Sequence, residues 1–151
     1  MQRQGVGMFT RILVALKYND TGRHALSVAA ELARIHGAEL IAFHALDYRL
    51  LAEGVSAAER DQACDAAHRR FEQEFGPIFR EGGTSDFVCL PADPAMAVCR
   101  LARERKADLI VLGCHQRGQG SGLSRMDYTG MTIMDKAPCP VLLVPYSDQP
   151  A

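Results

Sequence analysis

Short apolar runs alternate with amphipathic segments along most of this chain. Strands that are buried on both faces read as continuous apolar runs, which is typical of a parallel sheet. The runs that we expect to form strands are Ile12–Leu16, Leu40–Leu46, Phe87–Leu90, Asp108–Gly113 and Ala137–Pro145.

The segments between these runs carry apolar residues at helical spacing and predict four helices, with capping and turn residues near their ends. We expect the first helix to begin at Asn19–Gly22 and to end at Gly37. The second begins at the capping box Ser56–Glu59 and ends near Gly76–Pro77, with a continuation to Gly82–Gly83 left open. The third begins at Asp93–Pro94, and the fourth covers about 126–136.

This strict alternation of strands and helices predicts a single α/β domain. Right-handed crossovers then give a doubly wound parallel sheet of five strands with helices on both faces. We expect the domain to cover residues 9–146, with a flexible leader (1–8) and a flexible tail (147–151). With strand order 3-2-1-4-5, a ligand crevice lies beyond the carboxyl ends of the first and fourth strands, where the strand order reverses.

Composition and charge narrow the function classes. The 151 residues are 48% hydrophobic, which argues against a disordered chain, and 17 Lys and Arg against 18 Asp and Glu give a net charge of −1. Such a balance provides no broad field for nucleic acid or an anionic membrane, so neither is expected as a partner. The sequence has no membrane-spanning run and no signal peptide, so a cytoplasmic location is expected.

Five cysteines lie in apolar or helical contexts and lack the spacing of a zinc site. We therefore interpret them as buried thiols in a reducing compartment. Cys114 is a weak candidate nucleophile, because no third orienting group is evident. His44 and His115 can both face the crevice and serve acid–base chemistry or a metal, but structural roles explain them more simply. No catalytic residue and no metal site is predicted.

Two basic segments, His68–Arg70 and Arg100–Lys106, are interleaved with acidic residues. This charge pattern favours a solvated, salt-bridged surface over a nucleic-acid patch.

Four of these motifs, in their order and spacing, resemble the universal stress protein family. They are Ile12–Ala15 followed by a polar loop and an Ala-rich helix, Ala107–Gly113, the turn Gly113-x-His115-x-Arg117-Gly118, and Ala137–Pro145. The resemblance implies a Rossmann-like fold of the adenine nucleotide alpha hydrolase type. It also implies a homodimer and a role in surviving starvation or other stress.

The nucleotide pattern of this family is G-x-x-G, nine residues, then G-[ST], and this chain follows it only in part. Gly113 matches the first glycine, but Gln116 stands at the second, and Met126-Asp127 stands where Gly-Ser is expected. Lys17 ends the first strand, where nucleotide-holding members usually have an aspartate. The resemblance therefore favours a member that lacks the standard ATP site.

Two interpretations follow. In the first, the phosphate site is lost and the protein acts through its surface as a dimeric stress-response module. In the second, a modified pocket holds ATP, ADP or AMP, with Mg²⁺ as a counterion, or another anionic ligand, with slow ATP hydrolysis at most. The candidate binding residues are Ala15, Lys17, His44, Gly113, His115, Arg117, Gly118, Gly120, Gly122, Gly130 and Thr132.

The last apolar strand is the candidate dimer edge. An exposed edge strand can pair with another chain, and the family resemblance implies antiparallel pairing of this strand with its twin. We expect a two-fold dimer through Val141, Leu142, Leu143 and Val144.

Overall fold

A parallel sheet of five strands, in the order β3-β2-β1-β4-β5, forms the centre of the protein. The computed structural model describes residues 7–83, 85–115 and 128–146. This sheet confirms the expected fold class and strand order. The strands are β1 (Arg11–Ala15), β2 (Glu39–Leu46), β3 (Ser85–Pro91), β4 (Leu109–His115) and β5 (Val141–Tyr146).

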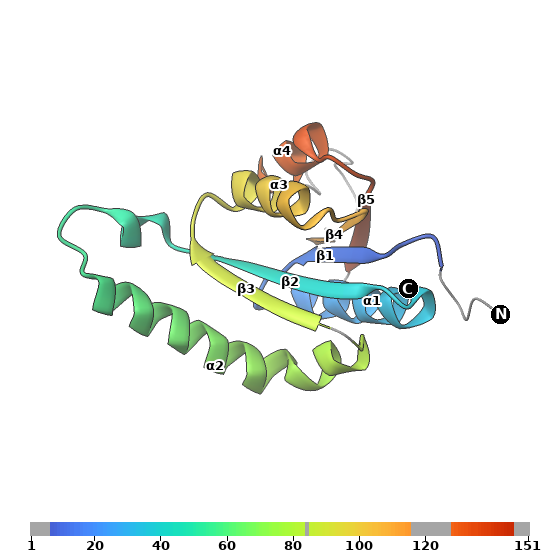
Figure 1. Cartoon of the computed structure of the whole chain (residues 1–151), viewed down its shortest axis with the longest axis horizontal. Coiled ribbons are helices and arrows are strands. Elements are labelled where there is room, and N and C mark those ends of the chain that lie inside the picture. The colour runs from blue at the N-terminus through green and yellow to red at the C-terminus, as the bar shows by residue number, and fades with distance from the viewer. Residues whose placement is uncertain (1–6, 84, 116–127, 147–151) are drawn as a thin grey trace.

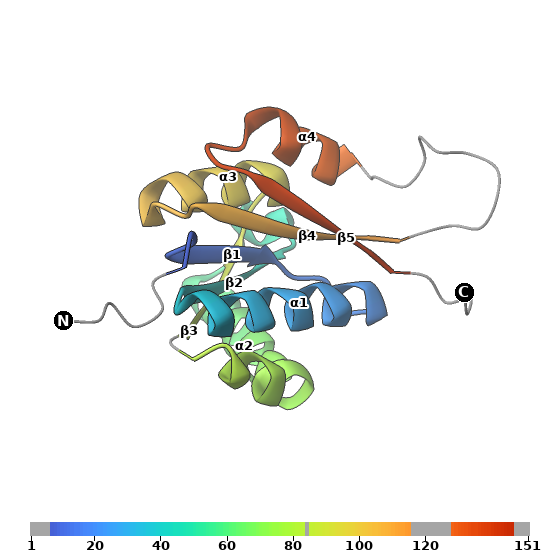
Figure 2. The same cartoon turned by 90° about the vertical axis from the view of Figure 1, so that its right-hand side faces the viewer.

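Helices cover both faces of the sheet, as Figures 1 and 2 show. α1 and α2 lie on one face, and α3 and α4 lie on the other. The helices are α1 (Asp20–His36), α2 (Ala57–Glu81), α3 (Pro94–Arg105) and α4 (Tyr128–Lys136), with a short 3₁₀ helix over Tyr48–Leu51.

Side-chain caps start three of these helices where the sequence predicts them. The Asn19 side chain accepts a hydrogen bond from the backbone of Gly22 at 2.8 Å, and Asp93 caps α3 in the same way. Ser56 and Glu59 form a complete capping box at the start of α2. Each cap satisfies backbone N–H groups that have no partner inside the helix.

α2 runs through Pro77 and ends at Glu81, beyond the expected end at Gly76–Pro77 and close to the alternative that was left open. Proline lacks the N–H that would bond the preceding turn, so its presence disfavours a helix interior. Phe71, Phe75 and Phe79 are nevertheless all buried against the sheet. The burial of Phe79 accounts for the continuation of the helix past the proline.

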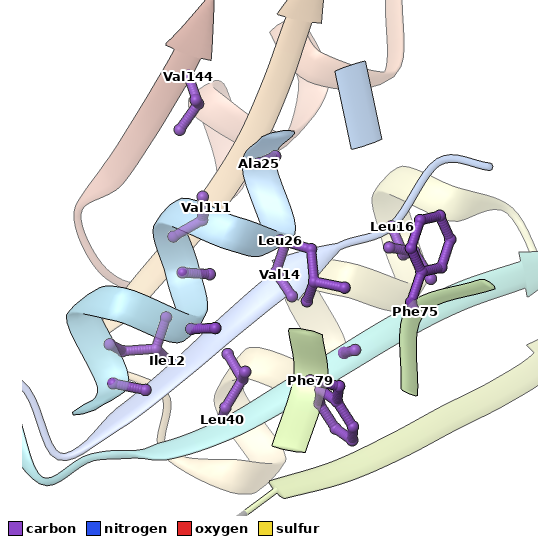
Figure 3. Packing of buried hydrophobic residues seen from close by; sticks show 14 of the residues in the cluster. Ile12, Val14, Leu16, Ala25, Leu26, Leu40, Phe75, Phe79, Val111 and Val144 are labelled. Atoms are coloured by element: carbon purple, nitrogen blue, oxygen red, sulfur yellow. The ribbon is translucent and has the colours of Figure 1, made fainter. Parts of the chain in front are cut away.

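Alternate residues of the central strands enter two separate cores. Ile12 and Val14 of β1 face α1 and α2, whereas Leu13 faces α3 and α4. Figure 3 shows the first core, in which Leu26 of α1 lies over Val14 of β1 and Phe75 of α2 lies beside Leu16. Both faces of the central sheet are therefore apolar, which explains the continuous apolar runs in the sequence.

Asp108 ties the beginning of β4 to the beginning of β1. Its carboxylate accepts hydrogen bonds from the backbone N–H of Thr10 at 2.8 Å, from the Thr10 hydroxyl at 2.8 Å and from the backbone N–H of Arg11 at 3.0 Å. These bonds fix the amino ends of two neighbouring strands. The Asp108 bonds do not involve the opposite, carboxyl ends of the strands, where a ligand site can form.

Most of the expected leader (1–8) and all of the expected tail (147–151) lie outside the described residues. The backbone N–H of Gly7 donates a hydrogen bond to the carbonyl of His36 at 3.1 Å. In the described part of the chain, no helix is long and apolar enough to cross a membrane.

The cysteines differ from the expectation of buried thiols. All five are free, but only Cys99 is fully buried. The other four are half-buried. Cys64 lies in α2, Cys89 in β3, Cys114 near the end of β4, and Cys139 just before β5.

Candidate functional site

A pocket of about 470 Å³ opens at the carboxyl ends of the central strands. β1 and β4 are neighbours there, and the helices that follow them, α1 and α4, cover opposite faces of the sheet. Doubly wound sheets bind ligands at such a point. The pocket lining comes from the end of β1 and the following loop, from β2 and β4, and from three helices. The lining residues are Ala15, Leu16, Lys17, Tyr18, Asn19, Phe43, His44, Ala45, Arg70, Pro94, Val98, Leu112, Gly113, Thr129, Gly130 and Ile133.

Five of the predicted binding residues meet in this pocket. They come from β1 and its following loop, β2, β4 and α4, and they are Ala15, Lys17, His44, Gly113 and Gly130. These residues are far apart in the sequence, and the strand order together with the position of α4 brings them to one pocket.

Two other predicted residues lie outside the lining. His115 is exposed at the end of β4, and the Thr132 hydroxyl donates a hydrogen bond to the carbonyl of Tyr128 at 2.9 Å, one turn earlier in α4. Thr129, rather than Thr132, is the α4 threonine that lines the pocket. The remaining predicted residues, Arg117, Gly118, Gly120 and Gly122, lie outside the described residues.

Gly113 has a packing role in addition to its place in the pocket. A Cβ atom at this position would lie 2.9 Å from both the carbonyl oxygen and the Cγ2 atom of Thr21 in α1. A glycine is therefore required for the close approach of α1 to β4. The need for glycine here is explained without any phosphate contact.

Gly22 allows the loop after β1 to fold back over the start of α1. A Cβ atom on Gly22 would lie only 1.7 Å from the carbonyl oxygen of Lys17. The tight approach holds the backbone of Lys17 at the rim of the pocket. The sequence indicated a turn at Asn19–Gly22 but not this contact.

The lining of the pocket includes apolar core residues as well as polar side chains. Phe43, Leu112 and Ile133 belong to the core beneath α3 and α4. The polar side chains include His44 and Tyr18, whose ring centroids lie 4.6 Å apart at an interplanar angle of 88°. A flat apolar ligand with a polar end fits this lining.

His44 is held as a neutral imidazole. Burial lowers the pKa of His44, the nearby Arg70 guanidinium lowers it further, and the carbonyl of Leu16, 3.5 Å from Nδ1, opposes this shift. The contact with Leu16 supports the structural interpretation of His44. Within the described ranges, no group of three His, Cys, Asp or Glu side chains is arranged to hold a metal.

Tyr18 is a fixed neutral phenol on the wall of the pocket. Burial raises the pKa of Tyr18 to about 12, and its hydroxyl donates to the carbonyl of Ala67 at 3.4 Å. Its ring also packs against Phe75, with centroids 5.4 Å apart. Tyr18 thus connects the pocket to α2.

Arg70 is the pocket residue that the sequence interpretation assigned elsewhere. Its Nε donates to Glu74 Oε1 at 2.8 Å, as expected for a salt-bridged surface, but the side chain also lines the pocket. The guanidinium carbon lies 4.1 Å from the centroid of the Tyr18 ring. The available signal was its position three residues after Ala67 and directly before Phe71, beside the buried stripe of α2.

Comparisons with known proteins agree with the fold and with the motifs. Residues 8–145 match the Universal stress protein family. A universal stress protein in the QAH/OAS sulfhydrylase 3' region of Thermus aquaticus is 33% identical over 140 residues, which cover 91% of this chain and 99% of that protein.

Solved structures show the same architecture. A protein from the universal stress protein family of Burkholderia pseudomallei is 28% identical, with a TM-score of 0.67 over 93% of this chain and 98% of its own. The universal stress protein from Archaeoglobus fulgidus in complex with dAMP is 23% identical, with a TM-score of 0.66 over 91% of this chain and 98% of its own. From the motifs, the fold and these matches, the chain belongs to the universal stress protein family.

Proposed function

We propose that this protein is a cytoplasmic, homodimeric stress-response module that binds a small anionic ligand in the pocket and turns it over slowly, if at all. The pocket carries this proposal, because it lies at the switch point of the sheet and has a volume of about 470 Å³. This size is within the range of small-molecule sites. Lys17 and Arg70 bring positive charge to an otherwise largely apolar lining.

Several residues argue against ATP bound in the way that is usual for the family, and they favour another ligand. Lys17 replaces the expected aspartate, and a lysine offers only donors where a carboxylate would accept bonds from hydroxyl groups. Gly113 is required for packing against Thr21, so its presence is no sign of a phosphate contact. The second glycine position of the pattern is Gln116.

Adenine mononucleotides are the first ligands to test. A mononucleotide combines a flat ring with one anionic group, and the pocket lining combines apolar core residues with charged side chains. The Archaeoglobus fulgidus relative with dAMP adds a reason to begin with this class.

The chemistry of the described lining supports binding better than turnover. Burial keeps the phenol of Tyr18 and the nearby thiol of Cys89 protonated, with the pKa of each raised to about 12. These two groups are poorly placed to act as a nucleophile or a base at neutral pH.

Calorimetric titration of the full chain with AMP, ADP, ATP and adenosine tests the proposal. We expect AMP to bind at one site per chain, adenosine to bind more weakly, and ATP to bind no more tightly than AMP. Absence of binding by all four compounds would contradict the proposal. Stoichiometric ATP that copurifies with the protein would contradict the altered ligand preference.

Lys17→Asn tests the contribution of the lysine. Because the change removes a cation, we expect AMP affinity to fall by about threefold to tenfold. Lys106→Asn is the control, since Lys106 follows α3 at the opposite end of the sheet and Asn tolerates its left-handed backbone, with a φ of 56°. If the two variants bind AMP with equal affinity, Lys17 does not contribute to the site.

A further inference from the structure

We propose that Arg70 of α2 determines the charge of the ligand by binding a phosphate or carboxylate oxyanion at the rim of the pocket. This inference rests on the proposed function and adds a specificity-determining residue to it. Arg70 belongs neither to the β1–β4 rim nor to any glycine motif. It reaches the pocket from α2, which covers the same face of the sheet as α1.

Two contacts fix the plane of the Arg70 guanidinium. Nε donates to Glu74 Oε1 at 2.8 Å, and the guanidinium carbon lies 4.1 Å from the centroid of the Tyr18 ring. An arginine has five N–H donors in a rigid fork. The bond to Glu74 uses the donor on Nε, so the terminal NH₂ groups carry the donors that suit two oxygens of one anion.

Tyr18 places this cation beside the binding surface. Its hydroxyl is bonded to the carbonyl of Ala67, and its ring is supported by Phe75 and His44. Tyr18 and Arg70 both line the pocket, so a ligand in contact with the ring also lies near the guanidinium. The arrangement suits a compound in which an oxyanion is attached close to a flat group.

His44 provides an independent reporter of this contact. The pKa of His44 is lowered by burial and, in addition, by the positive charge of Arg70. An oxyanion bound to the guanidinium would offset that charge and raise the pKa of His44 again. A change that affected only the packing of α2 would not produce a ligand-dependent shift of this kind.

The test compares Arg70→Gln and Arg70→Lys with Arg69→Gln in the full-length protein. Arg69 is the next residue of α2, is exposed and is not part of the pocket lining, so Arg69→Gln removes the same charge from the same helix. The probes are AMP, adenosine and pyrophosphate, measured by calorimetry. The pKa of His44 is measured by NMR with and without each probe.

We expect Arg70→Gln to weaken AMP binding by about threefold to tenfold, because a charge-assisted contact at a partly exposed site is lost. Adenosine should bind Arg70→Gln as it binds the wild type. The AMP affinity of Arg70→Lys should lie between those of Arg70→Gln and the wild type. Arg69→Gln should bind every probe as the wild type does. AMP should raise the pKa of His44 in the wild type, and by less in Arg70→Gln, where no arginine holds the phosphate near the imidazole.

The possible failures are distinct. If wild type binds AMP but Arg70→Gln and Arg69→Gln bind it equally well, Arg70 has no role and the proposed function stands. If AMP and adenosine do not bind but pyrophosphate does, and Arg70→Gln removes that binding, the nucleotide proposal fails and the role of Arg70 stands. If no probe binds the wild type, both proposals are overturned.

Discussion

At the scale of single residues, one glycine shows how a motif can be satisfied for a reason other than its usual one. Gly113 matches the first position of a phosphate-binding pattern, yet the carbonyl and the methyl group of Thr21 occupy the space that a side chain would need. A sequence shows only that a glycine is present. The neighbouring helix explains why no larger residue fits.

Gly113→Ala tests the packing role. The added Cβ would lie 2.9 Å from the backbone oxygen of Thr21, so α1 or β4 must shift, and we expect a loss of about 1–3 kcal/mol in the free energy of unfolding. Urea unfolding measures this change.

Gly76→Ala is the matched control. Its Cβ would meet mainly the flexible end of Glu72, which can move aside, and alanine is the better helix former, so stability should stay equal or rise slightly. Equal stabilities of the two variants would contradict the packing role of Gly113.

His44 predicts a pH dependence of stability. Its pKa in the folded protein lies below the ordinary value of 6.5, so the unfolded chain takes up the proton more readily. The neutral His44 therefore contributes to the free energy of unfolding. This contribution is fully present above pH 6.5 and is lost as the pH falls toward the pKa of His44 in the folded protein. Urea unfolding measures this effect. Between pH 7.5 and pH 5.5 the free energy of unfolding should fall less in His44→Gln than in the wild type, and an identical fall would contradict this account.

The candidate site was predictable from the sequence mainly where its residues belong to strand ends. Ala15, Lys17 and His44 could be placed at the crevice because parallel strands end at one edge of the sheet. Tyr18 follows Lys17 directly and belongs to the same strand end. Arg70 could not be placed there, since its position depends on how α2 lies across the sheet and on its contact with Tyr18. A charge pattern alone cannot distinguish a surface arginine from one at the edge of a pocket.

At the scale of secondary-structure elements, local chemistry predicted where helices begin better than where they end. The Asn19, Ser56 and Asp93 caps act on backbone groups within three residues, so the sequence contains all the participants. The end of α2 depends instead on Phe79 and its burial. This tertiary contribution outweighs the local effect of Pro77.

β5 carries the prediction of a homodimer. It lies at the edge of the sheet, where β4 is its one neighbour, and Leu142 remains 37% exposed. Light scattering coupled to size-exclusion chromatography should give twice the chain mass of 16.5 kDa at micromolar concentration. A mass of one chain under these conditions would contradict the dimer.

Leu142→Lys tests whether β5 is the interface. A lysine on an edge strand opposes pairing with another strand, so this variant should be monomeric. Ile35→Lys, on α1 and 58% exposed in the structure, is the control and should remain a dimer. A dimeric Leu142→Lys variant would place the interface elsewhere.

At the scale of the whole molecule, the continuity of the apolar runs was enough to predict the architecture. Strands such as β1 place successive residues in opposite cores, so neither face of the central sheet can be polar. Helices must then cover both faces, joined to the parallel strands by right-handed crossovers. The fold brings Lys17 of the β1–α1 loop, His44 of β2 and Gly130 of α4 to one pocket.

Chemical-shift mapping tests the central claim that this pocket binds a small anionic ligand. In a ¹H–¹⁵N NMR titration with AMP, we expect saturable shifts at Ala15, His44 and Thr129, which line the pocket. Thr10 and Asp108, at the opposite end of the strands, should not change. No saturable shift at millimolar AMP, or shifts confined to residues away from the pocket, would contradict the account.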